Sequence, residues 1–467
     1  MTETALVWLR SDLRIADNPA LRAGMAHGKV LALHIEATDS RLRRRGAASR
    51  WWLNRSLNAL AAELAALGVR LETAEGDTET VLFDFVGRHA ISVVFWNRRY
   101  GPVEREIDAG IKSRCRAEGI VAESFPGTVL VEPFEMQTAA GKPYSFYTPF
   151  WKTLRARPIP APMPAIPGTD AVAVPEVDTG YRAPAWAAKF ERHWQFGERA
   201  AQARLHHFLD DLVGDYHVNR DFPDRTVGSG LAPHLAFGEI SPHQIWHAAQ
   251  AVAQHQPAKA DAIDKFLSEL AWRDFSYNQL FHREDIAAVP MQPRFADLEW
   301  RSDEAALHAW QRGRTGFPII DAGMRELWET GFMHNRVRML VASLLAKNLL
   351  IDWRLGEQWF WDTLLDADPA NNPGNWQWVV GSGLDASPYF RIFNPVTQGD
   401  RFDADGGYVR RWVPELARLP DEWLQKPFEA PVEVLRRAGV VLGDTYPRPL
   451  VDLKLSRTRA LEAQQAL

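Results

Sequence analysis

Apolar runs alternate with helical stretches along the first part of the chain. Five runs have the length and composition of buried strands: Ala5–Leu9, Val30–Ile35, Val69–Ala74, Ile91–Trp96 and Gly119–Phe125. From Ala47 to Leu67 the apolar residues instead recur at helical spacing, on a stripe of Trp52, Leu53, Leu57, Leu60, Leu64 and Leu67. Strands separated by helices predict a parallel, doubly wound α/β sheet.

The remainder of the chain has a different pattern. The segment Pro158–Pro184 is rich in proline and has little periodicity, which is typical of a linker. From about Trp194 onward, good helix formers dominate seven segments: Ala200–Val213, Pro242–Gln254, Ala260–Phe281, Asp303–Arg312, Ile319–Glu329, His334–Leu350 and Glu357–Leu365. We therefore expect a Rossmann-like α/β domain at residues 1–130, a connector at 131–199 and an all-α domain at 200–467.

Composition narrows the class of protein. The apolar fraction of 46% is that of a globular protein, and no apolar run reaches the ~18 residues of a membrane span. The N-terminus has no apolar stretch typical of a secretory signal. The single cysteine, Cys115, excludes an internal disulfide, a four-cysteine zinc site and an iron–sulfur cluster within this chain. We expect a soluble cytoplasmic protein with no membrane partner.

Charge and tryptophan content bear on possible partners. The net charge of −5 means that any binding to DNA must come from a local basic patch. Of the 19 tryptophans, 12 lie between Trp246 and Trp423. Tryptophans mostly pack in cores, but this density indicates an aromatic cofactor or stacked bases.

Common nucleotide and metal motifs are missing from the sequence. It contains no P-loop, no G-x-G-x-x-G after the first strand and no H-E-x-x-H. The stretch Gly228–Leu231 could place backbone N–H groups around a phosphate, although glycine-rich turns are common. The basic run Arg41–Arg45 fits a solvated surface better than an anion site.

Two helical segments carry functional groups on one face. The spacing i, i+3, i+4 joins Glu269, Trp272 and Arg273 in the first segment, and Asn335, Arg338 and Met339 in the second. Such faces suit a binding site, and spacing alone also fits two amphipathic helices with surface charge.

A third stretch, Asp366–Trp378, is rich in Asp, Asn, Gly and Pro, which predicts a structured loop that opens a helix. On that helix the side chains of Trp376 and Trp378 diverge by roughly 200°, because each residue advances a helix by ~100°. One indole can therefore face the interior while the other faces a cavity.

Four runs resemble the DNA photolyase/cryptochrome family: VWLRSDLRIADNPAL, FMHNRVRM, DADPANNPGNWQW and SPYFRIFNPVTQG. The resemblance covers nearly the whole chain. It implies an N-terminal α/β domain, a connector and a helical domain that holds FAD. The MHNRVRM run resembles cyclobutane-dimer photolyases of class I and class III, and the choice between these classes stays open.

The resemblance also implies roles for individual residues. Those along the FAD diphosphate and ribityl chain are Tyr216, Gly228, Ser229, Gly230, Leu231 and Ala232, and those near the flavin ring are Arg338, Asp366, Asp368 and Asn372. Arg338 and Asp366 match an ion pair, and Asn372 matches the residue that faces flavin N5. The family loop often reads Thr-Ser-Arg-Leu-Ser, so the Gly-Ser-Gly-Leu-Ala of this chain lacks two hydroxyls and a guanidinium.

Further roles concern DNA and electron transfer. By resemblance, the lesion pocket comprises Glu269, Trp272, Asn335, Met339 and Trp378, with Arg220 and Arg336 as phosphate contacts. The catalytic set is Glu269, Asn335, Met339 and Asn372. The tryptophans expected to reduce the flavin under light are Trp376, Trp353 and Trp300.

The expected function is therefore light-dependent repair of cyclobutane pyrimidine dimers in UV-damaged DNA by a monomeric enzyme with reduced FAD as electron donor. The alternatives are a cryptochrome-type photoreceptor without repair activity and a generic flavin oxidoreductase, for which no nicotinamide site is visible. Glu104 aligns with a folate-contacting glutamate, although its neighbour Val103 replaces an asparagine. We expect 5,10-methenyltetrahydrofolate as antenna, with 8-hydroxy-5-deazaflavin or no antenna as alternatives.

Overall fold

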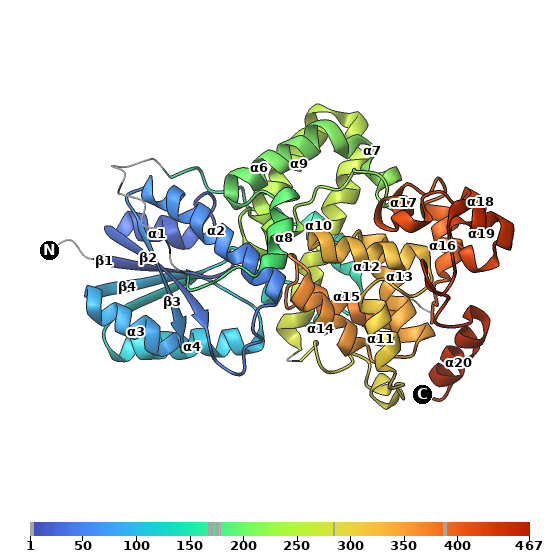
Figure 1. Ribbon diagram of the computed structural model, residues 1–467. Coiled ribbons are helices and arrows are strands. Elements are labelled where there is room, and N and C mark those ends of the chain that lie inside the picture. Colours follow the sequence, from blue (N-terminus) through green and yellow to red (C-terminus); the bar gives the residue numbers. More distant parts are fainter. Residues whose placement is uncertain (1–3, 167–171, 173–176, 178, 284, 386–389) are drawn as a thin grey trace. The chain divides into compact units, whose positions relative to one another are not determined.

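The computed structural model describes residues 4–166, 172, 177, 179–283, 285–385 and 390–467. The chain forms two compact units (Figure 1). The first unit comprises Met1–His217, Ser229–Glu284 and Asp366–Ala370, and the second comprises Val218–Gly228, Asp285–Leu365 and Asn371–Leu467. This division differs from the domain boundaries expected at residues 130 and 199, which stay a prediction.

The first unit contains the expected parallel sheet. Its strands are β1 (Thr4–Leu9), β2 (Lys29–Ala37), β3 (Arg70–Gly76), β4 (Ile91–Asn97) and β5 (Val121–Phe125). They lie in the order β3-β2-β1-β4-β5, and Val7 in the middle of β1 pairs with Ala32 on one side and Phe95 on the other. The central strands are apolar on both faces because helices cover both sides.

Four helices connect these strands: α1 (Pro19–His27), α2 (Ala47–Ala65), α3 (Thr78–His89) and α4 (Pro102–Ala117). Figure 1 shows α1 and α2 on one face of the sheet and α3 and α4 on the other. The α/β prediction is thus confirmed, with element ends shifted by one or two residues. For example, α2 ends at Ala65 rather than at Leu67.

The strand order reverses direction between β1 and β4, which is where open α/β sheets usually bind ligands. Here Arg10, directly after β1, forms two hydrogen bonds with Asp108 of α4, at 2.6 and 3.2 Å. The same guanidinium donates to the backbone carbonyl of Asn97 at the end of β4. The chain's own buried ion pair therefore bridges this crevice.

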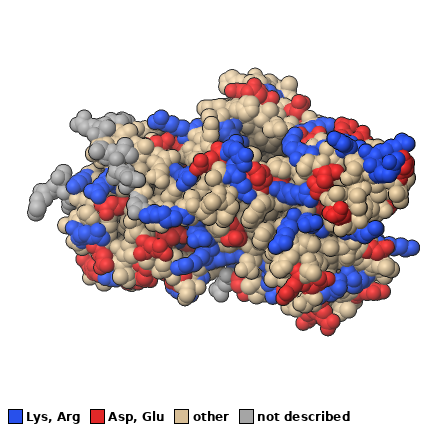
Figure 2. All heavy atoms as spheres, in the orientation of Figure 1, with Lys and Arg blue, Asp and Glu red and all other residues tan. Residues whose placement is uncertain are grey.

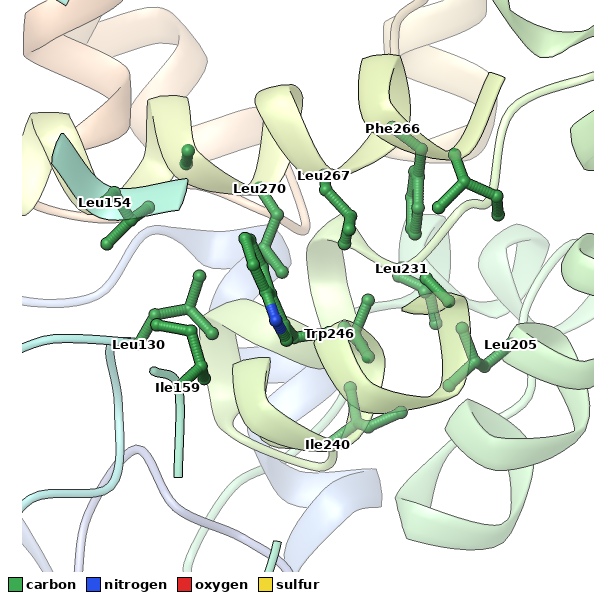
Figure 3. Close-up of a cluster of buried hydrophobic side chains, with 14 of the residues drawn as sticks. Leu130, Leu154, Ile159, Leu205, Leu231, Ile240, Trp246, Phe266, Leu267 and Leu270 are labelled. Carbon is green, nitrogen blue, oxygen red and sulfur yellow. The ribbon is translucent and has the colours of Figure 1, made fainter. Parts of the chain in front are cut away.

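The helices of the first unit that follow the sheet build a second core. They are η1 (Pro133–Glu135), α5 (Tyr147–Ala156), η2 (Ala185–Arg192), α6 (Gly197–His207), η3 (Phe208–Leu212), α7 (Val213–Asn219), α8 (Ala232–Phe237), α9 (Pro242–His255), η4 (Pro257–Lys259) and α10 (Ala260–His282), with the end of α7 in the second unit. Figure 3 shows Phe266, Leu267 and Leu270 of α10 packed in one cluster with Leu231 and Trp246. This cluster fixes which face of α10 is buried.

The described part of the second unit is helical. Its elements are η5 (Pro293–Asp297), α11 (Glu304–Gln311), α12 (Pro318–Thr330), α13 (Asn335–Ser343), η6 (Leu344–Asn348), α14 (Trp353–Thr363), α15 (Asn371–Val380), α16 (Pro395–Phe402), α17 (Gly407–Trp412), η7 (Pro414–Leu416), α18 (Asp421–Leu424), η8 (Pro427–Glu429), α19 (Val432–Ala438) and α20 (Leu453–Gln465). Within the described residues, no helix has the length and apolarity needed to cross a bilayer.

Two predicted helices contain a π-helical turn: η3 lies within the expected helix Ala200–Val213, and η6 within the helix expected from residue 334. The expected helix His334–Leu350 divides into α13 and a π-helical turn, η6. In that turn the buried Lys347 donates to the backbone carbonyl of Arg391 at 2.6 Å, and Asn348 donates to Ser456 at 3.0 Å. These two contacts pair the buried nitrogen atoms of Lys347 and Asn348 with distant segments.

Candidate functional site

The expected site residues fall in both units. The first unit holds Glu104, Tyr216, Ser229, Gly230, Leu231, Ala232, Glu269, Trp272, Asp366 and Asp368, and the second holds Arg220, Gly228, Trp300, Asn335, Arg336, Arg338, Met339, Trp353, Asn372, Trp376 and Trp378. Arg338 and Asp366 belong to different units, so their ion pair stays a prediction. We describe the two groups in turn.

Helix α10 presents Glu269 and Trp272 away from its most buried positions. The Trp272 indole stacks on Tyr147, with ring centroids 3.7 Å apart and planes at 10°. Tyr147 is itself fixed, because its hydroxyl lies 2.9 Å from the Ser268 hydroxyl. Glu269 is 28% exposed and pairs with Lys265 at 2.7 Å. The indole is therefore held rigidly, and the carboxylate remains accessible.

The loop of residues 228–232 has its conformation set by Gly230 and Leu231. Leu231 is buried in the core of Figure 3. Gly230 has φ of 63°, a left-handed conformation that favours glycine. A Cβ built on Gly230 would lie 3.2 Å from Cζ of Arg204 and closer still to Nη1. Tyr216 packs edge-to-face against Phe208 at 5.5 Å. The loop thus lies against a guanidinium that comes from α6.

Asp368 lies in the short segment that the first unit contributes after residue 365. It is buried, and its Oδ1 accepts the backbone N–H of Ala370 at 2.8 Å. Burial raises the pKa of Tyr277 on α10, and the negative charge of the nearby Asp368 adds to this rise. A buried carboxylate therefore lies beside α10.

In the second unit, the start of α13 is held by a hydrogen-bond chain. The side chain of His334 caps the helix and accepts the Arg336 N–H at 3.2 Å. The backbone N–H of His334 donates to Glu326 at 3.2 Å, and the Tyr408 hydroxyl donates to the same carboxylate oxygen at 2.6 Å. Burial raises the pKa of Glu326 to about 7, against the effect of these two donors.

The residues expected on one face of α13 are all at least partly accessible. Asn335 is exposed and Met339 half-buried, while Val337 on the opposite face is buried. Arg338 donates from Nε to the Met333 carbonyl at 2.7 Å. The three residues are thus accessible on α13, and their role in a binding site stays a prediction.

Arg336, the expected phosphate contact on α13, already has a partner. Its guanidinium pairs with Asp221 at 2.7 Å, and the Arg336 side chain is 16% exposed. It also lies 4.5 Å above the ring of Phe402. A phosphate would have to share this guanidinium with Asp221.

Helix α15 orients three functional side chains. The amide of Asn372 donates to Oε1 of Glu357 at 2.7 Å. Trp376 is 2% exposed, whereas Trp378 is half-buried. Between them, the buried Gln377 donates to the Ile286 carbonyl at 2.7 Å. The two indoles diverge as the two-residue spacing requires.

Trp376 packs against α14, the helix that begins at Trp353. A Cβ built on Gly356 would lie 2.8 Å from Cζ2 of Trp376. Trp353 is fully buried and three residues before Gly356, so both lie on one side of α14. The half-buried Trp300 precedes Arg301, whose N–H donates to the Leu350 carbonyl at 2.7 Å just ahead of α14. The three tryptophans thus belong to connected elements of one unit.

Glu104, the expected antenna contact, lies in the first turn of α4. A Cβ built on Gly101 would lie 2.8 Å from the Glu104 Cδ, so the side chain folds back over the start of its own helix. Burial lowers the pKa of Arg99 to about 10, and Glu104 and Asp108 are the nearby carboxylates that oppose this. Glu104 therefore lies near a partly buried cation.

Basic side chains are concentrated locally and do not cover the whole face that Figure 2 draws. On the face drawn in Figure 2, basic and acidic side chains are interspersed, and basic ones gather over α17 and α19. These helices carry Arg410, Arg411, Arg436 and Arg437, and Arg411, Arg436 and Arg437 are exposed. No three His, Cys, Asp or Glu side chains among the described residues come together as a metal site.

Sequence reasoning missed four residues of these networks: Arg204, Glu326, Glu357 and Tyr408. Only Glu326 carries a visible signal, since a glutamate that stands eight residues before a helix-capping histidine can reach its N–H. Glu357 and Asn372 are 15 residues apart, and Tyr408 and Glu326 are 82 apart. Such pairs depend on tertiary packing.

Comparison with known proteins shows similarity over the whole chain. A model of the FAD binding domain of DNA photolyase matches residues 266–466, and a DNA photolyase model matches residues 5–167. A deoxyribodipyrimidine photo-lyase of Agrobacterium fabrum is 46% identical, covering 100% of this chain and 98% of that protein. The crystal structure of a bacterial class III photolyase from Agrobacterium tumefaciens is also 46% identical, with a TM-score of 0.94 over 100% of this chain and 98% of that chain. Cryptochrome-1 of Arabidopsis thaliana is 36% identical, covering 98% of this chain and 70% of that protein.

Proposed function

Because the chain belongs to the DNA photolyase family, we propose that it is a deoxyribodipyrimidine photo-lyase that repairs cyclobutane pyrimidine dimers in light. The observation that carries this proposal is the arrangement on α15. Asn372 is oriented by Glu357, Trp376 is buried, and Trp378 is accessible. The similarity to a class III enzyme favours that class over class I.

FAD fits the side chains described above. Bound FAD would supply the light-absorbing electron donor. The residues that would hold it are those expected from the sequence: Tyr216, Gly228, Ser229, Gly230, Leu231, Ala232, Arg338, Asp366, Asp368 and Asn372. Asn372 uses its amide nitrogen on Glu357, which leaves its amide oxygen to accept a hydrogen bond from the flavin.

The lesion would be recognised by the accessible side chains. Trp272 and Trp378 would provide aromatic walls for the two pyrimidines, and Asn335 would hydrogen-bond a base edge. Glu269 and Met339 complete the proposed pocket, with Glu269 accessible enough to accept from a ring N–H. Arg220 and Arg336 would contact phosphates, and Trp300, Trp353 and Trp376 would reduce the flavin under light.

The decisive experiment illuminates the purified protein with an oligonucleotide that contains one thymine dimer. We expect loss of the dimer in light and none in darkness. A protein that binds FAD and photoreduces it, yet leaves the dimer intact, would instead be a cryptochrome-type photoreceptor. That alternative is supported by the cryptochrome relatives, among them Cryptochrome-1 at 36% identity, which are more distant than the photo-lyase at 46%.

The antenna is a separate proposal. We propose 5,10-methenyltetrahydrofolate near Glu104, with 8-hydroxy-5-deazaflavin as the alternative. The Arg10–Asp108 pair at the end of β1 argues against a large ring system at the usual crevice of the sheet. Extraction of the chromophores and their mass spectra test this proposal directly.

We further propose that the protein is a monomer that works in the cytoplasm. The single cysteine, Cys115, is buried, which agrees with a reducing compartment. Light scattering of the purified protein measures the assembly state, and fractionation of cells locates the protein.

A further inference from the structure

The guanidinium of Arg204 lies where a side chain at position 230 would begin. Arg204 is in the last turn of α6, and a Cβ built on Gly230 would come within 3.2 Å of its Cζ. Glycine at this position therefore does two things. It adopts the left-handed φ of 63°, and it leaves room for the guanidinium of Arg204.

The charge of Arg204 is not balanced by the protein. In the part of the chain that the structure describes, no carboxylate lies within ion-pair distance of this guanidinium. It lies 5.1 Å above the ring of Trp194, which holds the side chain in place. Burial lowers the pKa of Arg204, because the cation is less well solvated there than in water.

Two other arginines of the same unit that are buried or partly buried do have carboxylate partners. Arg10 pairs with Asp108 at 2.6 Å, and Arg98 pairs with Glu132 at 2.7 Å. A half-buried, unpaired guanidinium is costly unless an anion binds it, so Arg204 indicates an anionic ligand at the 228–232 loop.

We infer that Arg204 supplies to the diphosphate of the bound dinucleotide the guanidinium that the 228–232 loop lacks. The inference rests on the proposed binding of FAD. The family loop often has arginine at the position of Gly230, and here a neighbouring helix brings the same group to the same place. A planar guanidinium can donate two parallel hydrogen bonds to phosphate oxygens.

The loop itself complements this role. The Ser229 Oγ accepts the Leu231 N–H at 3.4 Å, so its hydroxyl hydrogen is directed elsewhere and can donate to a phosphate. Arg204 contributes charge, and Ser229 and the loop backbone contribute neutral donors.

The test measures how fast FAD leaves the holoprotein, from the rise in free flavin fluorescence at several salt concentrations. The variants are Arg204→Ala and Arg204→Lys. The matched control is Arg199→Ala, which removes an exposed arginine of the same helix that pairs with Glu63 at 3.5 Å. Thermal melting of each variant checks folding, and riboflavin, which has no diphosphate, serves as a second ligand.

We expect Arg204→Ala to release FAD about tenfold faster, the effect of losing one hydrogen bond to a charged group. Its release rate should also depend less on salt. Arg204→Lys should fall between Arg204→Ala and the wild type, and Arg199→Ala should match the wild type. Riboflavin affinity should be equal in all four proteins.

Two results would overturn the inference: release of FAD by Arg204→Ala at the wild-type rate, or an equal loss of riboflavin and FAD. If Arg204→Ala does not fold, Arg204→Lys tests the inference instead. Release of FAD by Arg204→Lys at the wild-type rate and with the wild-type salt dependence would then overturn it. A wild-type protein without FAD would instead contradict the proposed function, so the two failures are distinguishable.

Discussion

The side-chain amide nitrogen of Asn372 donates to both the carboxylate of Glu357, at 2.7 Å, and the backbone carbonyl of the same residue, at 3.0 Å. Both bonds use the same nitrogen, so the amide cannot turn over without losing them. Asn372 therefore presents an acceptor oxygen to any partner on its other side.

Glu357→Met should hold the Asn372 amide less firmly, because methionine fills the space but accepts only weakly, and only the bond to the backbone carbonyl of residue 357 remains. We expect the protein to keep its bound FAD. After chemical reduction, the flavin should reoxidise in air about tenfold faster, since one hydrogen bond to a charged group no longer orients the acceptor. The return of the oxidised-flavin absorbance measures this rate. Asn375→Ala is the control, because the Asn375 amide is exposed and bonds only within α15.

Trp376→Phe should block photoreduction of the oxidised flavin and spare repair by protein already reduced with dithionite. Phenylalanine preserves the packing against Phe360 at 5.1 Å but is much harder to oxidise. Trp310→Phe is the matched control, since Trp310 also packs against Trp376, at 6.2 Å, but lies outside the proposed chain. Flash absorption measures photoreduction of the flavin in both variants, and so compares the contributions of Trp376 and Trp310. Wild-type photoreduction in Trp376→Phe would show that the route runs elsewhere.

The sheet could be predicted from the sequence because its strands are continuous apolar runs. Val7 and its partners Ala32 and Phe95 all lie within runs recognised beforehand. The π-helical turn after Ser343 could not be predicted, since the partners of its residues Lys347 and Asn348 lie 44 and 108 residues away. Local periodicity contains no information on such contacts.

The same distinction applies to the site. Spacing within one helix identified the shared face of Asn335 and Met339, and the divergence of Trp376 from Trp378. It could not identify Glu357, or the guanidinium that Arg204 brings to Gly230 from another helix. Those partners are set by packing between elements, so they become visible only in three dimensions.

Glu326→Gln should change the pH dependence of stability. Burial raises the pKa of Glu326 from an ordinary value of 4.5 to about 7, so the folded protein holds a proton that the unfolded chain releases. The stabilisation from this group is complete below pH 4.5 and is lost as pH rises towards 7. Glutamine does not titrate and can still accept from Tyr408 and His334.

The melting temperature of Glu326→Gln relative to wild type should therefore rise between pH 5 and pH 8. In a domain of 150–250 residues the rise is about 2–4 °C for each ~1 kcal/mol of unfolding free energy that the wild type loses. Glu304→Gln, at an exposed position of α11, is the control. A difference that does not vary with pH would mean that Glu326 is ionised throughout this range.

Arg336→Ala and Asp221→Asn should act in opposite directions on DNA binding. Arg336 pairs with Asp221 at 2.7 Å, so Asp221→Asn frees the guanidinium for a phosphate and should raise affinity. Arg336→Ala should lower affinity and reduce the slope of log affinity against log salt by about 0.9 on duplex DNA. Titrations at four salt concentrations measure both slopes. If both variants merely melt earlier with unchanged slopes, the pair is structural.

Trp378→Ala should impair recognition of the lesion more than binding of FAD. A dimer must leave the duplex, and stacking on an aromatic side chain returns roughly 1–3 kcal/mol per base, so the preference for damaged over undamaged DNA should fall by about one to two powers of ten. The flavin spectrum should persist, because Trp376 is buried on the other side of α15 while Trp378 is accessible. Val379→Ala, which truncates a buried neighbour, controls for damage to the helix. Paired titrations with damaged and undamaged duplex at one salt concentration give the ratio. An unchanged ratio would show that Trp378 only packs the helix, and loss of FAD would show that the two indoles have exchanged roles.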